Sequence, residues 1–107
     1  MNKSKIIKDS NIFTQIIKTN NAVKNNYFKI FFIPSDKNYY GITVPKKVGK
    51  AHIRNKLKRR LKNIIITNEK DIQNNMKYVI IIKEASLNLD YQNMERIFLD
   101  LIKKVRK

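Results

Sequence analysis

The sequence predicts an α/β fold of the α+β type, a two-layer sandwich in which helices pack on a small mixed central sheet. Three observations predict it. Residues 10–18, 50–67 and 91–105 repeat apolar side chains at the spacing of an amphipathic α-helix. The runs between them are dense in β-branched and aromatic residues, which is typical of strands. The 107 residues are enough for a single domain, residues 1–107, with the order α-β-β-α-β-α.

The N-terminal part is predicted to be a tail followed by a short helix. Residues 1–8 form a basic segment that we expect to be mobile. Asp9 or Ser10 can cap a helix through a side-chain oxygen, and apolar residues recur at helical spacing up to Lys18. Residues 19–26 are rich in asparagine, so we expect them to form a loop that follows the helix.

Two strands are predicted next. Tyr27–Ile33 is rich in aromatic and β-branched residues and ends at Pro34. Tyr39–Val44 has the same character and ends at Pro45, which lacks the N–H group that the interior of a strand needs. We expect residues 35–38 to join these two strands as a hairpin.

The next predicted helix begins just after Gly49 and continues to about Thr67. Several apolar residues fall on one side of this helix at a spacing of three or four, and Ile53 extends that side one turn earlier. We expect that side to enter the core, while the other sides face solvent. The apolar residues that define it are Leu57, Leu61, Ile64 and Ile65.

The C-terminal part is predicted to be a strand and a helix. Polar residues 68–75 lead to Met76–Lys83, whose continuous apolar run fits a strand that is covered on both faces. A loop is expected at 85–89. Asp90 can then cap a last helix, whose periodicity continues to Val105.

The composition favours a polyanionic partner. The formal net charge is +16 at pH 7, which is extreme for a chain of this length. There is no cysteine and only one histidine, which excludes disulfides and disfavours a zinc site. No apolar run approaches the length of a membrane span, and the N-terminus lacks the pattern of a signal peptide. We therefore expect a cytoplasmic protein with no membrane role.

The positive charge is concentrated in the central helix and in the turn before it. No acidic residue occurs from Lys37 through Asn68. Like charges four residues apart repel each other and destabilise a helix by a few tenths of a kcal/mol per pair. A helix that is merely solvated would intersperse acids, so the pattern favours nucleic-acid binding over a solvated helix in a lysine-rich chain. Four cations recur at this spacing of four and form a charged ladder along the helix: Lys50, Arg54, Lys58 and Lys62.

Residues 46–51 and 54–59 carry a resemblance to a known family. Lys-Lys-Val-Gly-Lys-Ala followed by Arg-Asn-Lys-Leu-Lys-Arg resembles the signature of the bacterial ribonuclease P protein component, in which a small-residue turn precedes a helix with Arg-Asn-Arg and Lys-Arg. Lys56 stands where the family more often has arginine, which keeps the charge but loses the planar guanidinium. Lys62 also stands where arginine is common, and Arg60 where an apolar residue is usual. The resemblance covers nearly the whole chain.

The resemblance implies the protein subunit of a ribozyme. In that enzyme the RNA supplies the active site and holds the Mg²⁺ ions, and the reaction is endonucleolytic removal of the 5′ leader from precursor transfer RNA (tRNA). The implied partners are the catalytic RNA and precursor tRNA, with no obligate protein partner and no cofactor bound tightly by the protein alone. The resemblance also implies a left-handed βαβ crossover, whereas the general rule for parallel strands gives a right-handed one.

No residue of the chain is predicted to be catalytic, and the predicted metal ligands stay undefined. The basic residues are predicted to bind phosphates, because each cation can displace a counterion from RNA and so make affinity fall with salt. In the family the corresponding helix meets the catalytic RNA. The predicted RNA-binding residues are Lys46, Lys47, Lys50, Arg54, Asn55, Lys56, Lys58, Arg59 and Lys62.

The resemblance implies a second surface, a cleft for the single-stranded 5′ leader. Its aromatic positions fall on Phe13, Ile17 and Phe31. Aromatic rings can stack on unpaired bases, at about 1–3 kcal/mol per base. Ile17 replaces a ring with an aliphatic side chain, which weakens stacking there. The alternative interpretation is that all three side chains belong to the core.

Two other functions remain open from the residues alone. A non-catalytic RNA-binding protein, such as a small ribosomal protein, fits the charge and size equally well but predicts no dependence on an unpaired 5′ extension. An architectural DNA-binding protein predicts comparable affinity for duplex DNA. His52 has no partner in the sequence for catalysis or metal binding, so we expect it to lie on the surface of the helix.

Overall fold

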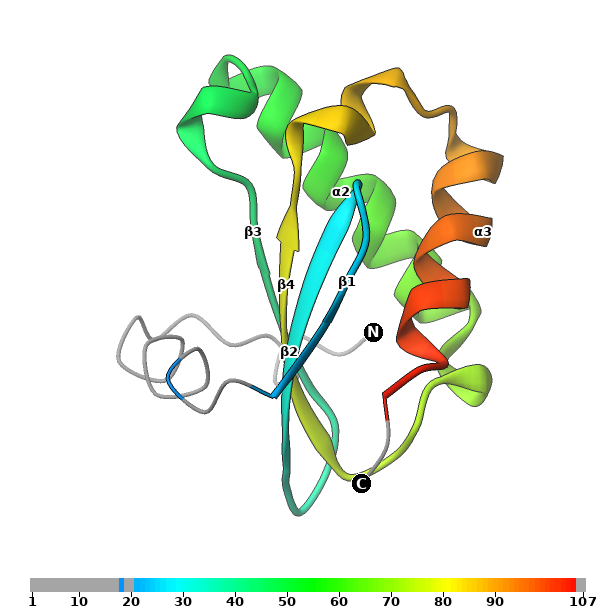
Figure 1. Ribbon diagram of the computed structural model, residues 1–107. Coiled ribbons are helices and arrows are strands. Elements are labelled where there is room, and N and C mark those ends of the chain that lie inside the picture. Colours follow the sequence, from blue (N-terminus) through cyan, green and yellow to red (C-terminus); the bar gives the residue numbers. More distant parts are fainter. Residues whose placement is uncertain (1–17, 19–20, 106–107) are drawn as a thin grey trace.

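The computed structural model describes Lys18 and residues 21–105. The strands form one four-stranded mixed sheet in the order β1-β2-β4-β3, and α2 and α3 cover one face of it (Figure 1). This confirms an α+β architecture. Along the chain the elements are β1 (Ala22–Lys24), β2 (Phe28–Pro34), β3 (Tyr39–Thr43), α2 (Ala51–Thr67), β4 (Met76–Ile82) and α3 (Tyr91–Ile102), with short 3₁₀ helices η2 (Lys46–Val48), η3 (Glu69–Asp71) and η4 (Glu84–Asn88).

The start of the predicted chain order lies mostly outside the described residues. The predicted tail, residues 1–8, is not described. Of the predicted first helix only its last residue, Lys18, is described, and Lys18 is helical and exposed. The observed order over the described residues is β-β-β-α-β-α.

The prediction of a hairpin at residues 35–38 is wrong. Strand β4 lies between β2 and β3, antiparallel to β2 and parallel to β3, so that Val79 pairs with both Phe31 and Gly41. A short polar connection between two β-rich runs usually signals a hairpin. Here β4 displaces that pairing, because a strand that is apolar on both faces is best buried in the middle of a sheet. Strands β3 and β4 with α2 form the predicted βαβ unit, whose left-handed crossover stays a prediction.

The loop predicted at residues 19–26 contains a strand that the sequence did not signal. Strand β1 pairs with β2, with Val23 opposite Ile30. Three residues are too few to show a period of two, so no pattern could mark them. Asn25 forms the turn between the two strands, because its side-chain oxygen accepts hydrogen bonds from the N–H groups of Tyr27 and Phe28, both at 2.8 Å.

The remaining differences between the predicted and observed elements are mainly short 3₁₀ helices that stand where loops were predicted. These short helices have i to i+3 hydrogen bonds and leave no 3.6-residue pattern in the sequence. Helix α3 begins at the predicted cap, since Asp90 accepts a hydrogen bond from the N–H of Asn93 at 2.8 Å. It ends at Ile102 and not at Val105, although the Val105 side chain is still buried in the core.

The core lies between the sheet and the two helices. The predicted apolar side of α2 is buried, at Leu57, Leu61, Ile64 and Ile65. Helix α3 is fixed to the sheet by an edge-to-face contact between Phe98 and Phe28, with ring centroids 5.6 Å apart. Because α2 is held by this one side, its remaining sides are free to carry charge.

A buried polar cluster closes the end of the core near the start of β3. The rings of Tyr40 and Tyr78 stack with centroids 5.6 Å apart. Asn38 donates to the Tyr40 hydroxyl at 3.0 Å and accepts from the N–H of Met76 at 3.1 Å. The Tyr78 hydroxyl donates to the Gln73 carbonyl at 2.7 Å. The cluster therefore ties the beginning of β3 to the beginning of β4.

We predict that Tyr40 and Tyr78 ionise later than ordinary tyrosines. Burial raises the pKa of Tyr40 to about 12, against a smaller lowering by the Asn38 hydrogen bond, and burial also raises the pKa of Tyr78. An unfolded tyrosine ionises near pH 10. The stability that these groups contribute is therefore intact below pH 10 and lost as the pH rises toward 12. Ultraviolet titration of tyrosinate should show two late transitions, and Tyr40→Phe should remove one. A single transition near pH 10 would contradict the prediction.

Candidate nucleic-acid interface

The predicted RNA-binding residues lie together on η2, on Lys50 and on the outer sides of α2. Lys46 and Lys47 are exposed on η2, and Lys50 is the exposed residue that caps α2. On α2 itself, four residue positions separate successive members of the charged ladder, so they project from neighbouring turns. Asn55, Lys56 and Arg59 are exposed, whereas Arg54, Lys58 and Lys62 are half-buried. We call these nine residues the basic surface.

The first turn of α2 adds to the positive potential of the basic surface. It contains no acidic residue, and no side chain caps its free N–H groups. The N-terminal end of a helix carries a partial positive charge that favours anions. His52 is exposed on this turn, as predicted. Phosphates near Lys50 would therefore meet both ammonium groups and the helix end.

Arg54 is held in place by the turn that precedes the helix. Its Nε donates to the Gly49 carbonyl at 3.2 Å, which leaves the two terminal nitrogens of the guanidinium for a ligand. Gly49 allows a close approach, because a Cβ at this position would lie 3.3 Å from Cγ2 of Ile53 and the Ile53 side chain would have to shift. The turn and the helix thus orient the guanidinium before any RNA is bound.

We predict that Arg54→Lys weakens binding to ribonuclease P RNA about tenfold without changing its salt dependence. Lysine keeps the charge, but it lacks the planar fork that can bond to Gly49 and to a phosphate at once. The measurement is RNA affinity over a series of salt concentrations. Lys58→Arg is the matched control, since it adds a fork on the next turn and should not weaken binding. An Arg54→Lys protein with unchanged affinity would contradict this role.

Arg60 supports the fold instead of extending the basic surface. Its Nη1 donates to the Leu89 carbonyl at 3.4 Å, in the segment that leads into α3. One turn later, Asn63 donates to the Tyr91 hydroxyl at 2.8 Å. Asn68 then donates to the Glu95 carboxylate at 2.9 Å. These contacts align α2 with α3, and sequence reasoning found none of them because their partners lie far apart in the chain.

The sheet face away from α2 and α3, which we call the outer face, is apolar in its centre. Phe31 and Val79 are buried there, with Ile33, Tyr39 and Ile81 packed against them. Phe31 is only 4% exposed, which favours a packing role for its ring. Its predicted contact with the leader stays a prediction. The other two residues predicted for the leader cleft, Phe13 and Ile17, lie outside the described residues.

A hollow of about 370 Å³ joins the outer face to the basic surface. Lys29 and Ile81 reach it from the sheet, and Lys47 reaches it from η2. Lys83 also lines it, with its Nζ donating to the Asn25 carbonyl at 2.7 Å. Three lysines and one acidic residue, Glu84, line the hollow. A polyanion can therefore pass from η2 onto the sheet along a path of net positive charge.

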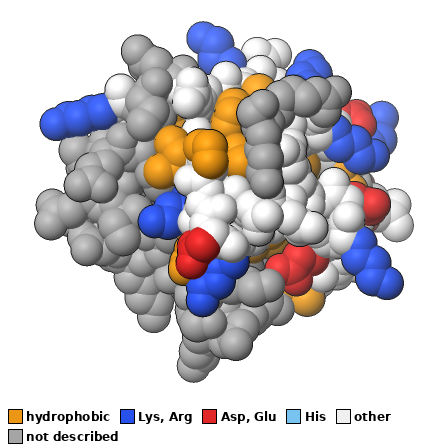
Figure 2. Space-filling view, turned by 90° about the horizontal axis from the view of Figure 1, so that it is seen from below, with side chains coloured by type: hydrophobic (Ala, Val, Ile, Leu, Met, Phe, Trp, Pro, Cys, Tyr) orange, Lys and Arg blue, Asp and Glu red, His pale blue; other side chains and the backbone are white. Residues whose placement is uncertain are grey.

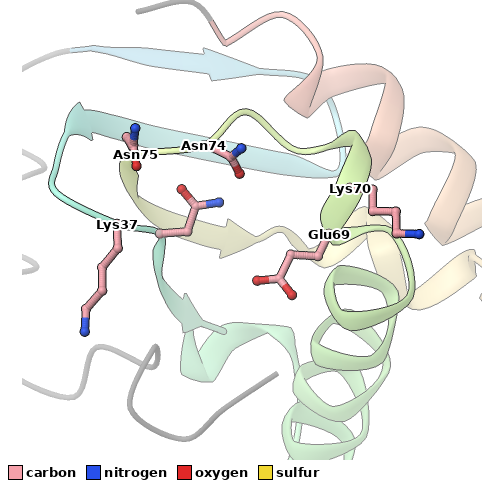
Figure 3. Close-up of a pocket in the computed structure, with 6 residues that line it drawn as sticks. Lys37, Glu69, Lys70, Asn74 and Asn75 are labelled. Atoms are coloured by element: carbon pink, nitrogen blue, oxygen red, sulfur yellow. The ribbon is translucent and has the colours of Figure 1, made fainter.

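The opposite end of the molecule has a different character. Figure 2 shows this end, where cations and acids are scattered around uncharged atoms. An open pocket of about 510 Å³ lies between the start of β3 and η3, lined by lysine, glutamate and asparagine side chains (Figure 3). This pocket lies at the opposite end of β3 from η2, so it does not extend the basic surface. Its lining residues are Lys37, Asn38, Glu69, Lys70, Asn74 and Asn75.

Within the described part of the chain, no three His, Asp or Glu side chains are grouped so that they could hold a metal ion. No helix among the described residues is long and apolar enough to span a membrane.

Comparison with known proteins identifies the family. The family model described as Ribonuclease P matches residues 1–106. The ribonuclease P protein component of Mycoplasma capricolum is 34% identical over 109 residues, covering 99% of this chain and 100% of that protein. The RNase P protein from Thermotoga maritima, solved with 1-(4-fluorophenyl)-2-thiourea, is 27% identical, with a TM-score of 0.87 over 94% of this chain and 99% of that one.

A Staphylococcus aureus RNase P protein structure has the same fold, with a TM-score of 0.83 at 24% identity, covering 94% of each chain. The basic surface and the sheet order thus occur in a chain whose whole length matches one family. The chain belongs to the bacterial ribonuclease P protein family, and is a protein component of ribonuclease P, the endoribonuclease of tRNA processing.

Proposed function

We propose that the chain binds both the catalytic RNA of ribonuclease P and the unpaired 5′ leader of precursor tRNA. In this role it assists the endonucleolytic cut that removes the leader and leaves the mature 5′ end. The observation that carries the proposal is the basic surface, which is acid-free and lies on a helix held by its opposite side in a chain of this family. The nine residues from Lys46 to Lys62 are assigned to RNA contacts.

The proposed contribution of the protein is electrostatic and positional. Two RNAs repel each other, and the net charge of +16 lowers that repulsion where they meet. Phe13, Ile17 and Phe31 are assigned to the leader cleft, so that precursor is bound in preference to mature tRNA. The assembly is expected to work in the cytoplasm, without an obligate protein partner.

Mg²⁺ is assigned mainly to the RNA, where it supplies activation of the water that attacks the phosphodiester. The cations of the basic surface lower the charge density around the RNA and favour its folded, substrate-bound form. The basic surface consists of lysine, arginine and asparagine side chains. Lysine and arginine are themselves cations with no acceptor atom, so they do not bind metal ions. We expect the protein to act on the metal sites mainly through the RNA.

The test is cleavage of a 5′-extended precursor tRNA by a bacterial ribonuclease P RNA at low Mg²⁺, with and without the protein. We expect the protein to restore cleavage at the correct 5′ position. The assembled enzyme should also bind the precursor more tightly than the mature tRNA. If the protein binds RNA but leaves cleavage unchanged at every ratio of protein to RNA, the proposal fails and a generic RNA-binding role replaces it.

A further inference from the structure

The outer face carries cations beside its aromatic rings. The Nζ of Lys29 lies 4.8 Å from the ring centroid of Phe31 on β2. On β3, the Tyr39 ring has two such neighbours, with the Nζ of Lys37 at 5.4 Å and the Nζ of Lys77 at 5.3 Å. Lys77 comes from the adjacent strand, where it pairs directly with Tyr39.

The two aromatic residues differ in how far a ligand can reach them. Phe31 is 4% exposed at the centre of the outer face. Tyr39 is half-buried on β3, which is an edge strand of the sheet. It packs on the apolar cluster and is partly exposed. Of these two rings, Tyr39 is therefore the one that an unpaired base can reach without displacing core side chains.

The charges around Tyr39 fit a nucleic-acid backbone. Lys37 is exposed, and Figure 3 shows its side chain turned away from Asn74 and Asn75. Among the described residues, no ion pair holds Lys37 or Lys77. Asp36, which directly precedes Lys37 in the chain, accepts a hydrogen bond from Ser35 at 3.0 Å, and this bond lowers the pKa of its carboxyl more than the charge of Lys37 does. Lysine ammonium groups rest over a ring by a weak cation–π attraction and are easily redirected to a phosphate.

We propose that Tyr39, Lys37 and Lys77 form a nucleotide-binding position for single-stranded RNA at the far end of the outer face. The base stacks on the accessible part of the Tyr39 ring, and the two ammonium groups move onto the flanking phosphates. The inference rests on the proposed function, because the strand that occupies this position is the 5′ leader. The inference adds Tyr39 to the residues assigned to the leader, although the sequence pattern of the basic helix does not indicate it.

The position of Tyr39 along the sheet says which part of the leader it holds. Tyr39 begins β3, and the basic surface starts after the other end of that strand. From Tyr39 to Thr43 the strand rises about 13 Å. The hollow lined by Lys29 and Lys47 lies near the end of the sheet where β3 leads into η2. We infer that the leader enters at the hollow, because the hollow adjoins the basic surface that is assigned to the catalytic RNA. On that path, the nucleotides that pass over Phe31 and reach Tyr39 are the ones distant from the cleavage site.

The experiment uses enzyme assembled from a bacterial ribonuclease P RNA and the full chain. Affinity is measured for precursors whose unpaired leader is lengthened one nucleotide at a time. With wild-type protein the affinity should rise in steps as the leader lengthens. Tyr39→Leu keeps an apolar side chain for packing but removes the ring, and it should abolish the last step, about a tenfold loss for long leaders. It should leave the shortest leader unaffected.

Matched variants separate stacking from charge and from folding. Tyr39→Phe keeps the ring and should retain the last step. Lys77→Gln should weaken the salt dependence for long leaders only, while Lys104→Gln, an exposed lysine beyond α3, should change nothing. Thermal melting of each variant gives the control for folding.

Three results would overturn the inference. Equal losses for all leader lengths in Tyr39→Leu would assign the residue to folding or to docking of the catalytic RNA. Unchanged affinity for every leader would remove Tyr39 from the interface while leaving the proposed function intact. Failure of the wild-type protein to stimulate cleavage at all would overturn the proposed function, and the inference with it.

Discussion

Replacing Lys50, Lys56 and Arg59 together by glutamine should weaken binding to ribonuclease P RNA by roughly two to three orders of magnitude. The three side chains are exposed on successive turns of the basic surface. A hydrogen bond to a charged partner is worth about 1.5–3 kcal/mol, and 1.4 kcal/mol is a factor of ten in affinity. Three such bonds would sum to about three to six orders of magnitude. The contacts are exposed and share one partner, so the combined loss should fall well below that sum.

The salt dependence gives a second measurement of the same variant. Each phosphate contact that is lost lowers the slope of log affinity against log salt by about one, so the slope should fall by about three. The matched control replaces Lys70, Arg96 and Lys104, which removes the same charge from exposed positions away from the basic surface. An equal loss of affinity in the control would show that net charge alone, and not this surface, binds the RNA.

Phe98→Ala should destabilise the protein by about 3–5 kcal/mol, the usual range for removing a buried ring. Phe98 is fully buried and touches Phe28, so its loss opens a cavity between α3 and the sheet. The free energy of unfolding of a domain is typically about 5–15 kcal/mol. Self-repulsion at a net charge of +16 lowers the stability further, so the variant should lose a large part of the stability of the fold.

Urea unfolding at low temperature measures this effect directly. Leu99→Ala is the matched control on the same helix, because Leu99 is only half-buried and its truncation should cost much less. Added sulfate should raise the midpoint of both proteins, since anions bind the folded basic surface. A loss below about 1 kcal/mol for Phe98→Ala would mean that the neighbouring side chains close the cavity.

The central helix could be predicted from the sequence because each of its determinants is local. Its apolar side, from Leu57 to Ile65, repeats with the helical period, and its basic sides follow from the same spacing. The cap at Asp90 was predicted for the same reason, since a cap needs only its own side chain and the next turn. The nine residues of the basic surface lie together because they share one continuous segment of chain.

The sheet order could not be predicted, because it depends on contacts between distant residues. Nothing near Pro34 or Tyr39 indicates that β4 will separate their strands. Strand β1 was missed because it is short and is held by pairing with β2. The cations beside Tyr39 were missed for a related reason, since Lys77 reaches that ring only through the register of β3 and β4.

The place of β4 between β2 and β3 has a consequence for how the protein is made. The ribosome synthesises the basic helix before it reaches Met76, so an incomplete nascent chain presents its polycation while the sheet still lacks its central strand. Strands β2 and β3 do not pair with each other in the final sheet. Both pair with β4, which is synthesised after them. A product of premature termination between residues 68 and 75 would keep the RNA-attracting charge without the fold that orients it, and it would bind cellular RNA indiscriminately.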